Sequence, residues 1–256
     1  MPRKLGQHFL NDQGALRRIA AALPLDENSH VVEIGPGRGA LTAALLATGA
    51  SVTAVELDPY LLSWLRENLP HERLELVAGD ALTVDLAALS RPDRPSFLAG
   101  NLPYYITSPL VRRALEARAA FRQAVFLVQK EVAERIVARK GSRDYGYLSA
   151  LCRLYAEPEL LFSVKPGSFR PPPKVDSAVF RLLLRQDVPA QPETERFLEA
   201  AFRQPRKTLR NNLRGLFDDE LVSAQPEAGL RAQQLDLEEL TALHRRLREQ
   251  SANALS

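Results

Sequence analysis

The chain has 256 residues, of which 45% are hydrophobic, and its formal net charge is +3 at pH 7. A chain of this length and apolar content can bury one full domain and a small second one. The single cysteine, Cys152, excludes an intramolecular disulfide framework and is interpreted as a buried core residue, and the four scattered histidines exclude a zinc site. No apolar run approaches the ~20 residues of a membrane span, so we expect a soluble, cytoplasmic protein without a metal.

A glycine-rich turn follows the first predicted strand. An N-terminal arm and a helix near 12–23 precede a short buried strand at 31–34. The turn at 35–39 carries glycine at its first, third and fifth positions, and strong helix formers follow at 40–46. A strand, a glycine turn and a helix in this order typically bind a nucleotide cofactor.

Acidic residues stand at or near the ends of the first three predicted strands. The second strand, 51–55, is followed by Glu56, whose carboxylate can accept both hydroxyls of an adenosine ribose. The third, 74–78, leads to Asp80, which can accept the exocyclic amine of the cofactor's adenine. Glu56 and Glu33 could instead be solvated, and Asp80 could cap a helix. Acids at three successive strand ends nevertheless favour a cofactor site.

The length of the glycine turn favours one cofactor over another. Its Gly-x-Gly-x-Gly pattern is one residue shorter than the pyrophosphate-binding pattern of dinucleotide enzymes. Nothing downstream of it indicates a centre for hydride transfer. We therefore predict that the chain binds S-adenosylmethionine rather than NAD.

The fourth predicted strand, 96–100, is followed by the segment Asn101-Leu102-Pro103-Tyr104. An Asn-x-Pro-Tyr segment at a strand end suggests methylation of an amine attached to an aromatic ring. Such an amine is a poor nucleophile because its lone pair is delocalised. The side-chain carbonyl of Asn101 and the backbone carbonyl of Leu102 or Pro103 can each accept an N–H, which favours a pyramidal nitrogen as positive charge develops.

The tyrosine of this segment has a separate role. Tyr104 supplies a flat face on which an extruded base can stack, whereas Tyr105 is interpreted as a packing residue. Taken alone, the segment could be only a turn after a strand, since Asn and Pro are common turn residues. The glycine turn and the acids upstream make the catalytic interpretation the stronger one.

The alternation of strands and helices predicts an α/β fold with a doubly wound sheet. A fifth strand is expected at 124–128, and two apolar runs at 160–164 and 178–184 leave no room for a crossover helix, so we expect them to form an antiparallel pair at one sheet edge. The connection between those runs, 165–176, carries four prolines. Phe169 lies within it and is expected to be exposed; the alternative is that it covers the edge of the core.

The C-terminal part is predicted to be a small all-helical domain. A linker at 186–192 precedes helical patterns near 193–203, 206–216 and 236–249. We therefore divide the chain into domains 1–185 and 186–256. Five basic residues follow one another there without an intervening acid, at a helical spacing that places most of them on one face and can neutralise RNA phosphates: Arg203, Arg206, Lys207, Arg210 and Arg214. A solvated helix face is the ordinary alternative.

These motifs, taken in order, resemble a known family over nearly the whole chain. The chain is similar to ribosomal RNA small-subunit adenine dimethyltransferases of the bacterial kasugamycin-sensitivity type, whose relatives include the erythromycin-resistance methylases of large-subunit RNA. The resemblance rests on the following segments: 4–10, 33–37, 55–58, 79–81, 101–104, 129–132, 169–177 and 206–211.

The resemblance implies a Rossmann-like class I methyltransferase that dimethylates two adjacent adenosines in a hairpin near the 3′ end of small-subunit (16S) RNA. It implies that the protein acts as a monomer on a pre-30S particle, and that Phe169 faces Tyr104 to sandwich the target adenine. It further implies contacts to S-adenosylmethionine by the following residues: His8, Leu10, Gly35, Gly37, Glu56, Asp80 and Asn101. Many relatives carry Asn where this chain has His8, so only the side-chain contribution differs there.

Two other functions compete with this one. A large-subunit RNA or DNA adenine methylase would share the cofactor site and an Asn-x-Pro-Tyr segment. A ribosome-assembly factor that binds RNA, with methylation secondary or lost, belongs to a different class. Intact Glu56, Asp80 and Asn101 argue against loss of activity.

Overall fold

Residues 8–253 are described in a computed structural model, in which the chain divides into two compact units. The first unit comprises Met1–Ala133 and Tyr155–Val188, and the second comprises Glu134–Leu154 and Pro189–Ser256. The predicted domains differ from these units because residues 134–154 pack with the C-terminal segment. Tyr145, for example, packs edge-on against Phe202, with 5.6 Å between the ring centroids.

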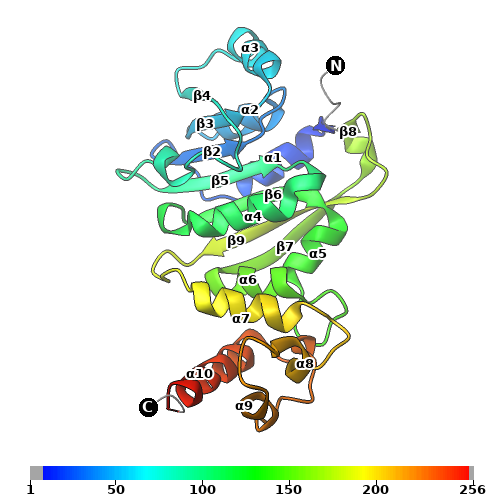
Figure 1. Cartoon of the computed structure of the whole chain (residues 1–256). Coiled ribbons are helices and arrows are strands. Elements are labelled where there is room, and N and C mark those ends of the chain that lie inside the picture. Colours follow the sequence, from blue (N-terminus) through cyan, green and yellow to red (C-terminus); the bar gives the residue numbers. More distant parts are fainter. Residues whose placement is uncertain (1–7, 254–256) are drawn as a thin grey trace. The chain divides into compact units, whose positions relative to one another are not determined.

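A seven-stranded sheet forms the centre of the first unit (Figure 1). The strands lie in the order β4-β3-β2-β5-β6-β9-β7. Their bounds are β2 His30–Ile34, β3 Ser51–Glu56, β4 Leu74–Ala78, β5 Ser96–Asn101, β6 Gln123–Gln129, β7 Ala156–Val164 and β9 Ser177–Leu184. The first five run parallel, whereas β9 pairs antiparallel with both β6 and β7. The predicted α/β sheet with an antiparallel edge pair is therefore confirmed.

The helices alternate with the strands as predicted. Those of the first part of the chain are α1 Gln13–Ala21, α2 Ala40–Leu46, α3 Pro59–Asn68, α4 Thr107–Glu116, α5 Lys130–Val137 and α6 Tyr147–Tyr155. The C-terminal ones are α7 Pro192–Phe202, α8 Leu209–Leu213, α9 Asp219–Ser223 and α10 Leu237–Asn253. Short 3₁₀ turns are η1 Ala87–Leu89, η2 Tyr104–Ile106, η3 Arg118–Ala120, η4 Pro166–Ser168 and η5 Ala232–Gln234.

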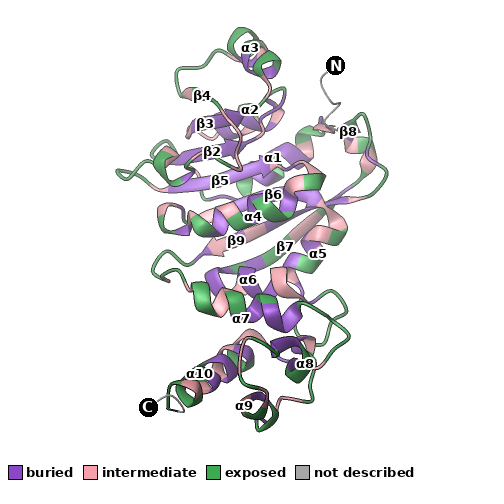
Figure 2. Cartoon of the chain, in the orientation of Figure 1, coloured by how far each residue is buried: buried purple, intermediate pink, exposed green. Residues whose placement is uncertain are grey.

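The burial of the central strands explains why they appear in the sequence as short apolar runs. All five residues of β2 are buried, and all but the last residue of β5 are as well (Figure 2). Helices cover both faces of a doubly wound sheet, so its central strands need apolar residues throughout rather than in alternation. Cys152 in α6 is also buried, and desolvation raises the pKa of its thiol to about 12. It is a core residue, as predicted.

A second, two-stranded pairing ties the N-terminal arm to the proline-rich connection. Strand β1, Phe9–Leu10, pairs antiparallel with β8, Phe169–Arg170, so that Leu10 lies opposite Phe169. The helix that follows the arm begins where the Asp12 side chain accepts the N–H groups of Gly14 and Ala15. The arm is thereby held beside the sheet.

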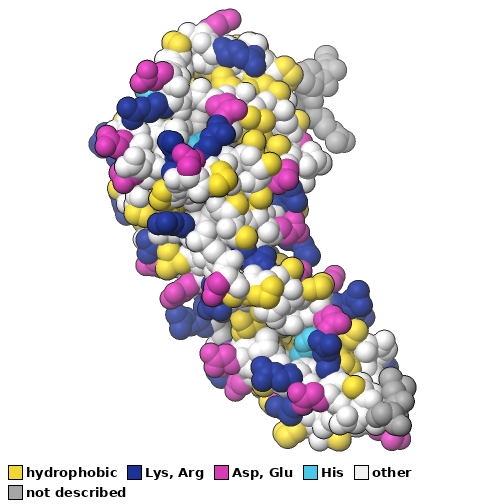
Figure 3. Space-filling view, turned by 90° about the vertical axis from the view of Figure 1, so that its left-hand side faces the viewer, with side chains coloured by type: hydrophobic (Ala, Val, Ile, Leu, Met, Phe, Trp, Pro, Cys, Tyr) yellow, Lys and Arg dark blue, Asp and Glu magenta, His cyan; other side chains and the backbone are white. Residues whose placement is uncertain are grey.

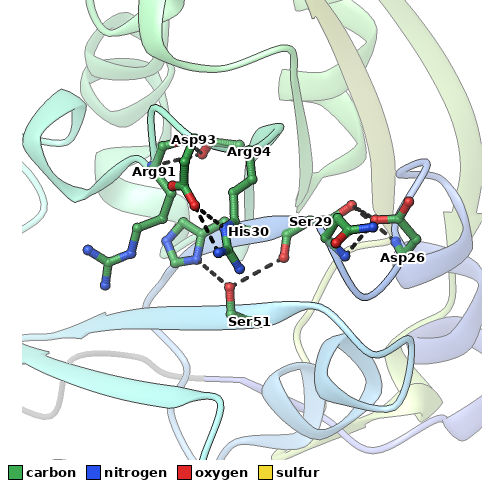
Figure 4. A network of polar contacts seen from close by, with 9 residues as sticks. Asp26, Ser29, His30, Ser51, Arg91, Asp93 and Arg94 are labelled. Atoms are coloured by element: carbon green, nitrogen blue, oxygen red, sulfur yellow. Dashed lines mark hydrogen bonds and ion pairs between the residues drawn. The ribbon is translucent and has the colours of Figure 1, made fainter.

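Polar side chains close the amino end of the parallel strands (Figure 4). His30 lies at the start of β2, where its Nδ1 is 2.9 Å from the Ser51 Oγ and its Nε2 is 3.1 Å from the Leu89 carbonyl. Burial lowers the pKa of this imidazole, and the nearby Arg91 lowers it further. This partnered histidine is structural, and the functional candidates lie at the opposite ends of the strands.

Candidate active site

A cavity lies at the carboxyl ends of β2, β3, β4 and β5. In a parallel sheet these ends meet at one edge, and the register aligns Ile34 of β2 with Val55 of β3. Side chains from the arm, the glycine turn and the segment after β5 all line the cavity. Its lining includes His8, Leu10, Glu33, Gly35, Gly37, Arg38, Glu56, Asp80, Asn101, Leu102, Pro103, Tyr104 and Tyr105. The structure thus brings together every residue predicted to contact the cofactor.

The glycine turn has a backbone that other residues adopt only with strain. The φ angles of Gly35, Gly37 and Gly39 are 68°, 58° and 78°, in the left-handed region. A Cβ on Gly37 would also lie 2.8 Å from Cε1 of Phe9. The aromatic ring of the arm therefore rests directly on the turn, and both conditions require glycine.

Glu56 connects the turn to the end of β3. Its side chain is 5% exposed, and its Oε2 accepts the N–H of Gly37 at 3.2 Å. Its Oε1 accepts the N–H groups of Leu57 and Asp58 at 2.9 and 3.0 Å. Burial raises the pKa of this carboxyl, although the three backbone donors oppose that rise. The alternative of a solvated Glu56 is wrong.

Glu33 is buried in the wall of the same cavity. Its Oε2 accepts the hydroxyl hydrogen of Thr42 at 2.6 Å, and burial raises the pKa of the carboxyl to about 8. A carboxyl with that pKa is largely protonated at neutral pH. The alternative of a solvated Glu33 is therefore also wrong.

Asp80 lies in the turn that follows β4, at the wall of the cavity. Its Oδ1 accepts the N–H of Leu82 at 2.9 Å, which stabilises the turn after β4, and the residue also lines the cavity. The alternative that Asp80 caps a helix is wrong, because the residues that follow it form a turn and no helix begins there. A contact with the cofactor stays a prediction.

Asn101, the last residue of β5, is joined to the arm. Its Nδ2 donates to the backbone carbonyl of His8 at 3.0 Å. The Leu102 N–H donates to the Leu127 carbonyl at 3.0 Å, and the Pro103 carbonyl accepts from the Ile106 N–H and the Thr107 hydroxyl, each at 3.2 Å. The sequence left two backbone carbonyls, those of Leu102 and Pro103, as possible acceptors for the target amine. Because the Pro103 carbonyl already accepts two hydrogen bonds within its own turn, the Leu102 carbonyl is the better candidate.

Gly100 was not singled out in the sequence, although it determines where Asn101 lies. A Cβ at this position would be 2.7 Å from the Ile34 carbonyl oxygen and 3.0 Å from a methyl of Leu102. Strands β2 and β5 approach each other closely because residue 100 has no side chain. A glycine directly before a strand-end asparagine is the signal that could have revealed this constraint.

Tyr104 is held in place at both ends of its side chain. Its hydroxyl is 2.6 Å from the Ser177 Oγ, and its ring stacks on the His8 imidazole, with 5.7 Å between centroids and 30° between planes. The Nδ1 of His8 lies 2.9 Å from the Pro171 carbonyl and so donates to it. The arm therefore positions both the amide and the aromatic ring of the Asn-x-Pro-Tyr segment.

Two expectations about aromatic residues are wrong. Phe169 is 0% exposed, because β8 turns its ring into a core cluster with Leu10 and Leu16. It covers the core, the alternative to the expected exposure, and cannot stack on a base in this conformation. Tyr105 is 62% exposed rather than packed.

The helix predicted near 206–216 is present but shorter than expected. The helix α8 covers only Leu209–Leu213, and Arg203 caps the end of α7, so the five basic residues do not share one helix face. Arg210 pairs with Asp219 at 2.8 Å, and Arg214 lies 3.6 Å from the same carboxylate. Over the surface drawn in Figure 3, Lys and Arg side chains are interspersed with Asp and Glu, in keeping with the low net charge.

Neither a membrane span nor a metal cluster is found where the structure can be described. Within residues 8–253, no helix is both long and apolar enough to cross a membrane. In the same range, His, Cys, Asp and Glu side chains do not gather in groups of three that could hold a metal ion.

The chain matches known proteins over most of its length. The family model described as ribosomal RNA adenine dimethylase matches residues 1–240. A ribosomal RNA small subunit methyltransferase A from Pseudomonas putida is 41% identical over 97% of this chain and 95% of its own length. The protein of the same name from Acidobacterium capsulatum is 43% identical, over 97% of this chain and 92% of its own length.

Solved structures agree with this match. A dimethyladenosine transferase from Plasmodium falciparum superposes with a TM-score of 0.82 at 26% identity, covering 95% of this chain and 98% of that one. The 23S rRNA methyltransferase ErmE superposes with a TM-score of 0.70 at 31% identity, covering 94% of this chain and 99% of that one.

Proposed function

The chain belongs to the ribosomal RNA adenine dimethylase family, and we propose that its substrate is the small-subunit RNA. As a member of this family it is an S-adenosylmethionine-dependent methyltransferase acting on adenine in ribosomal RNA. The names of the two bacterial relatives support the small subunit. The resemblance of the motifs supports two adjacent adenosines in a hairpin near the 3′ end as the site of dimethylation.

The cavity suits S-adenosylmethionine, which supplies an electrophilic methyl group on a sulfonium when bound. The left-handed glycines leave the turn backbone bare, and the buried Glu56 lies against it. We assign the ribose hydroxyls to Glu56 and the adenine amine to Asp80. The remaining contacts are assigned to residues that line the same cavity: His8, Leu10, Gly35, Gly37 and Asn101.

Asn101 and Leu102 activate the target amine in this proposal. The Asn101 amide nitrogen donates to His8, which leaves Oδ1 as the acceptor for one N–H of the adenine. The carbonyl of Leu102 accepts the other, with Pro103 fixing the direction of the chain. As the nitrogen takes the methyl group it becomes cationic, and both oxygens stabilise that charge before a proton leaves. After the first transfer the amine keeps only one N–H, so the second transfer proceeds with one hydrogen bond fewer to these two oxygens.

Tyr104 is assigned to stack on the extruded adenine. Its hydroxyl bond to Ser177 and its contact with His8 fix the orientation of the ring before RNA arrives. The buried Phe169 is not assigned to the opposite face of the base, because its ring belongs to the core. It instead supports β1 through its pairing with Leu10.

The remaining assignments concern the RNA-contacting region and the particle. We assign residues 186–256 to RNA contact, through Arg203, Arg206, Lys207, Arg210 and Arg214. We propose that the protein methylates the RNA within a pre-30S particle. We also propose that the active species is a cytoplasmic monomer. Sedimentation of the protein with small-subunit precursors, against mature subunits, tests the first point, and light scattering tests the second.

The single observation that carries this proposal is the meeting of Asn101 and Tyr104 with Glu56 and Asp80 in one cavity. The test incubates 16S and 23S RNA with S-adenosylmethionine and the protein, and maps methyladenosines by mass spectrometry. We expect a pair of dimethyladenosines in the small-subunit RNA alone, formed about 10²-fold more slowly or slower still by Asn101→Ala. Methylation confined to 23S RNA would instead assign the chain to the activity named for ErmE.

A further inference from the structure

The ring of Tyr105 lies exposed at the edge of the cavity. It is 62% exposed, and it lines the same cavity as Asn101 and Tyr104. Among residues 8–253, the only other large exposed aromatic side chain is Tyr60, which is 69% exposed and does not line the cavity. Exposing a large aromatic ring leaves apolar surface in water, so a ring in this position is available to a ligand.

The local backbone directs the two tyrosines differently. Both belong to η2, and a 3₁₀ helix has about three residues per turn, so successive side chains point roughly 120° apart. Tyr104 is turned inward, onto His8 and Ser177. Tyr105 therefore points away from the position assigned to the target base, although it directly follows Tyr104 in the chain.

Resting on the proposed function, we propose that Tyr105 stacks on the base of a nucleotide adjacent to the target adenosine. An extruded nucleotide remains joined to its neighbours by single phosphodiester links, so a neighbour must pass over the rim that Tyr105 forms. A nucleobase is the fitting occupant because the exposed ring borders the cavity in which Asn101 and Tyr104 are assigned to the target adenine. Tyr105 is then a positioning residue that holds the strand while the target adenine lies between Asn101 and Tyr104.

Stacking by an exposed ring makes no hydrogen-bonded choice among bases. The contact consequently accepts any neighbouring base, and it would serve equally whichever of two adjacent adenosines is in the cavity. It also accounts for the exposure of Tyr105, since a ring packed into the fold could not reach a strand outside the cavity.

The test measures binding of an RNA hairpin that carries two adjacent adenosines in its loop, by fluorescence anisotropy. Abasic forms of this RNA lack the base on the 5′ side or on the 3′ side of the target. Tyr105→Ala should weaken binding of the intact hairpin about tenfold, and Tyr105→Phe should restore it to within about twofold, since the face of the ring is kept. Tyr60→Ala is the matched control and should bind like wild type.

The abasic hairpins make the test specific. At one of the two flanking positions, loss of the base should weaken wild-type binding by about the same tenfold, and Tyr105→Ala should lose nothing more. Equal losses for wild type and Tyr105→Ala at both positions would overturn the proposal. So would a fall in S-adenosylmethionine affinity measured by calorimetry with RNA binding unchanged, because the ring would then belong to the cofactor.

Failure of the proposed function has a different signature. If wild type binds neither the hairpin nor small-subunit particles, the assignment of the substrate falls, and the Tyr105 proposal falls with it. If wild type binds and methylates the hairpin but shows no coupling between Tyr105 and either flanking base, only the Tyr105 proposal is overturned.

Discussion

The side-chain nitrogen of Asn101 donates a hydrogen bond to the backbone carbonyl of His8, across 3.0 Å and 93 positions of sequence. This bond joins the end of β5 to the N-terminal arm. Because the arm also stacks His8 on Tyr104, one segment determines the orientation of both groups assigned to the target adenine. A change in the position of the arm would therefore move the amide of Asn101 and the ring of Tyr104 together.

Asn101→Ala should lower single-turnover methylation by about 10²-fold or more, the range found when one electrostatic group is removed from an active site. The variant loses the acceptor for the target N–H as well as the bond to His8. Affinity for S-adenosylmethionine, measured by calorimetry, should change much less, because Glu56 and Asp80 remain. Full activity on native RNA would leave Asn101 with only a structural role.

Asn101→Asp is a less faithful control than the sequence alone suggests. It retains an acceptor oxygen, but it replaces the Nδ2 donor with an oxygen facing the His8 carbonyl at 3.0 Å. Two acceptors repel at that distance, so the arm should loosen. We expect Asn101→Asp to retain partial activity at best and to bind cofactor more weakly than Asn101→Ala.

Glu56→Gln should reduce the affinity for S-adenosylhomocysteine by about tenfold or more, because an amide cannot accept from two ribose hydroxyls and Gly37 together. The sharper measurement compares this ligand with its 2′-deoxyribose analogue. Wild type should discriminate between the two, and the variant should discriminate less. Equal discrimination by both proteins would remove the ribose assignment from Glu56.

The centre of the sheet could be predicted from sequence because β2, β3 and β5 are short, almost fully buried and followed by clear turn residues. Glu56 and Asn101 are the last residues of β3 and β5, where the apolar runs end. The glycine turn at 35–39 could also be predicted, because glycines at three alternate positions after a strand indicate such a turn. Each of these features depends on neighbouring residues, so a short stretch of sequence is enough to predict it.

Two of the features that the sequence did not reveal depend on distant contacts, and a third has a local cause. Phe169 is buried because β8 pairs with the arm, more than 150 positions earlier, and nothing in the proline-rich segment itself shows that pairing. The helix predicted at 206–216 is interrupted because Arg214 leaves helical geometry at the end of α8, where Gly215 follows with a φ of 82°. The close approach at Gly100 likewise depends on Ile34 of another strand.

Gly100→Ala should destabilise the first unit by roughly 1–3 kcal/mol, since the added Cβ would meet the Ile34 carbonyl oxygen at 2.7 Å and force the strands apart. It should also impair methylation by moving Asn101. Gly167→Ala is the matched control, because a Cβ there has no atom within 4 Å, and it should change stability by no more than about 0.5 kcal/mol. Equal melting temperatures for the two variants would contradict the steric argument.

The basic residues of the second unit should contribute unequally to RNA binding. Within the described residues, the exposed Arg206 and Lys207 have no acidic partner, whereas Arg210 and Arg214 share Asp219. Arg206→Ala with Lys207→Ala should reduce the magnitude of the negative slope of log K against log salt by roughly 0.7–0.9 for each RNA phosphate that is no longer neutralised. Arg210→Ala with Arg214→Ala should reduce it less. An unchanged slope in the first double variant would make these residues a solvated surface.

Stability should depend on pH through Glu33, whose pKa is raised by burial from 4.5 to about 8. Between these values the folded protein keeps a proton that the unfolded chain has released. The free energy of unfolding therefore falls as the pH rises from about 4.5 to about 8, and it levels off above that. This sign is the opposite of that expected for a carboxylate stabilised by an ion pair, whose pKa is lowered in the fold.

Glu33→Gln should remove this dependence, because the amide cannot ionise but its oxygen can still accept from Thr42. The variant should match wild type at pH 5 and exceed its stability by roughly 2–4 kcal/mol at pH 9. Denaturant unfolding followed by fluorescence of Trp64, the single tryptophan and a residue of α3, reports on the first unit. Glu67→Gln on the exposed side of α3 should follow the wild-type curve. Parallel curves for wild type and Glu33→Gln across this pH range would show that Glu33 ionises in the fold as it does in the unfolded chain.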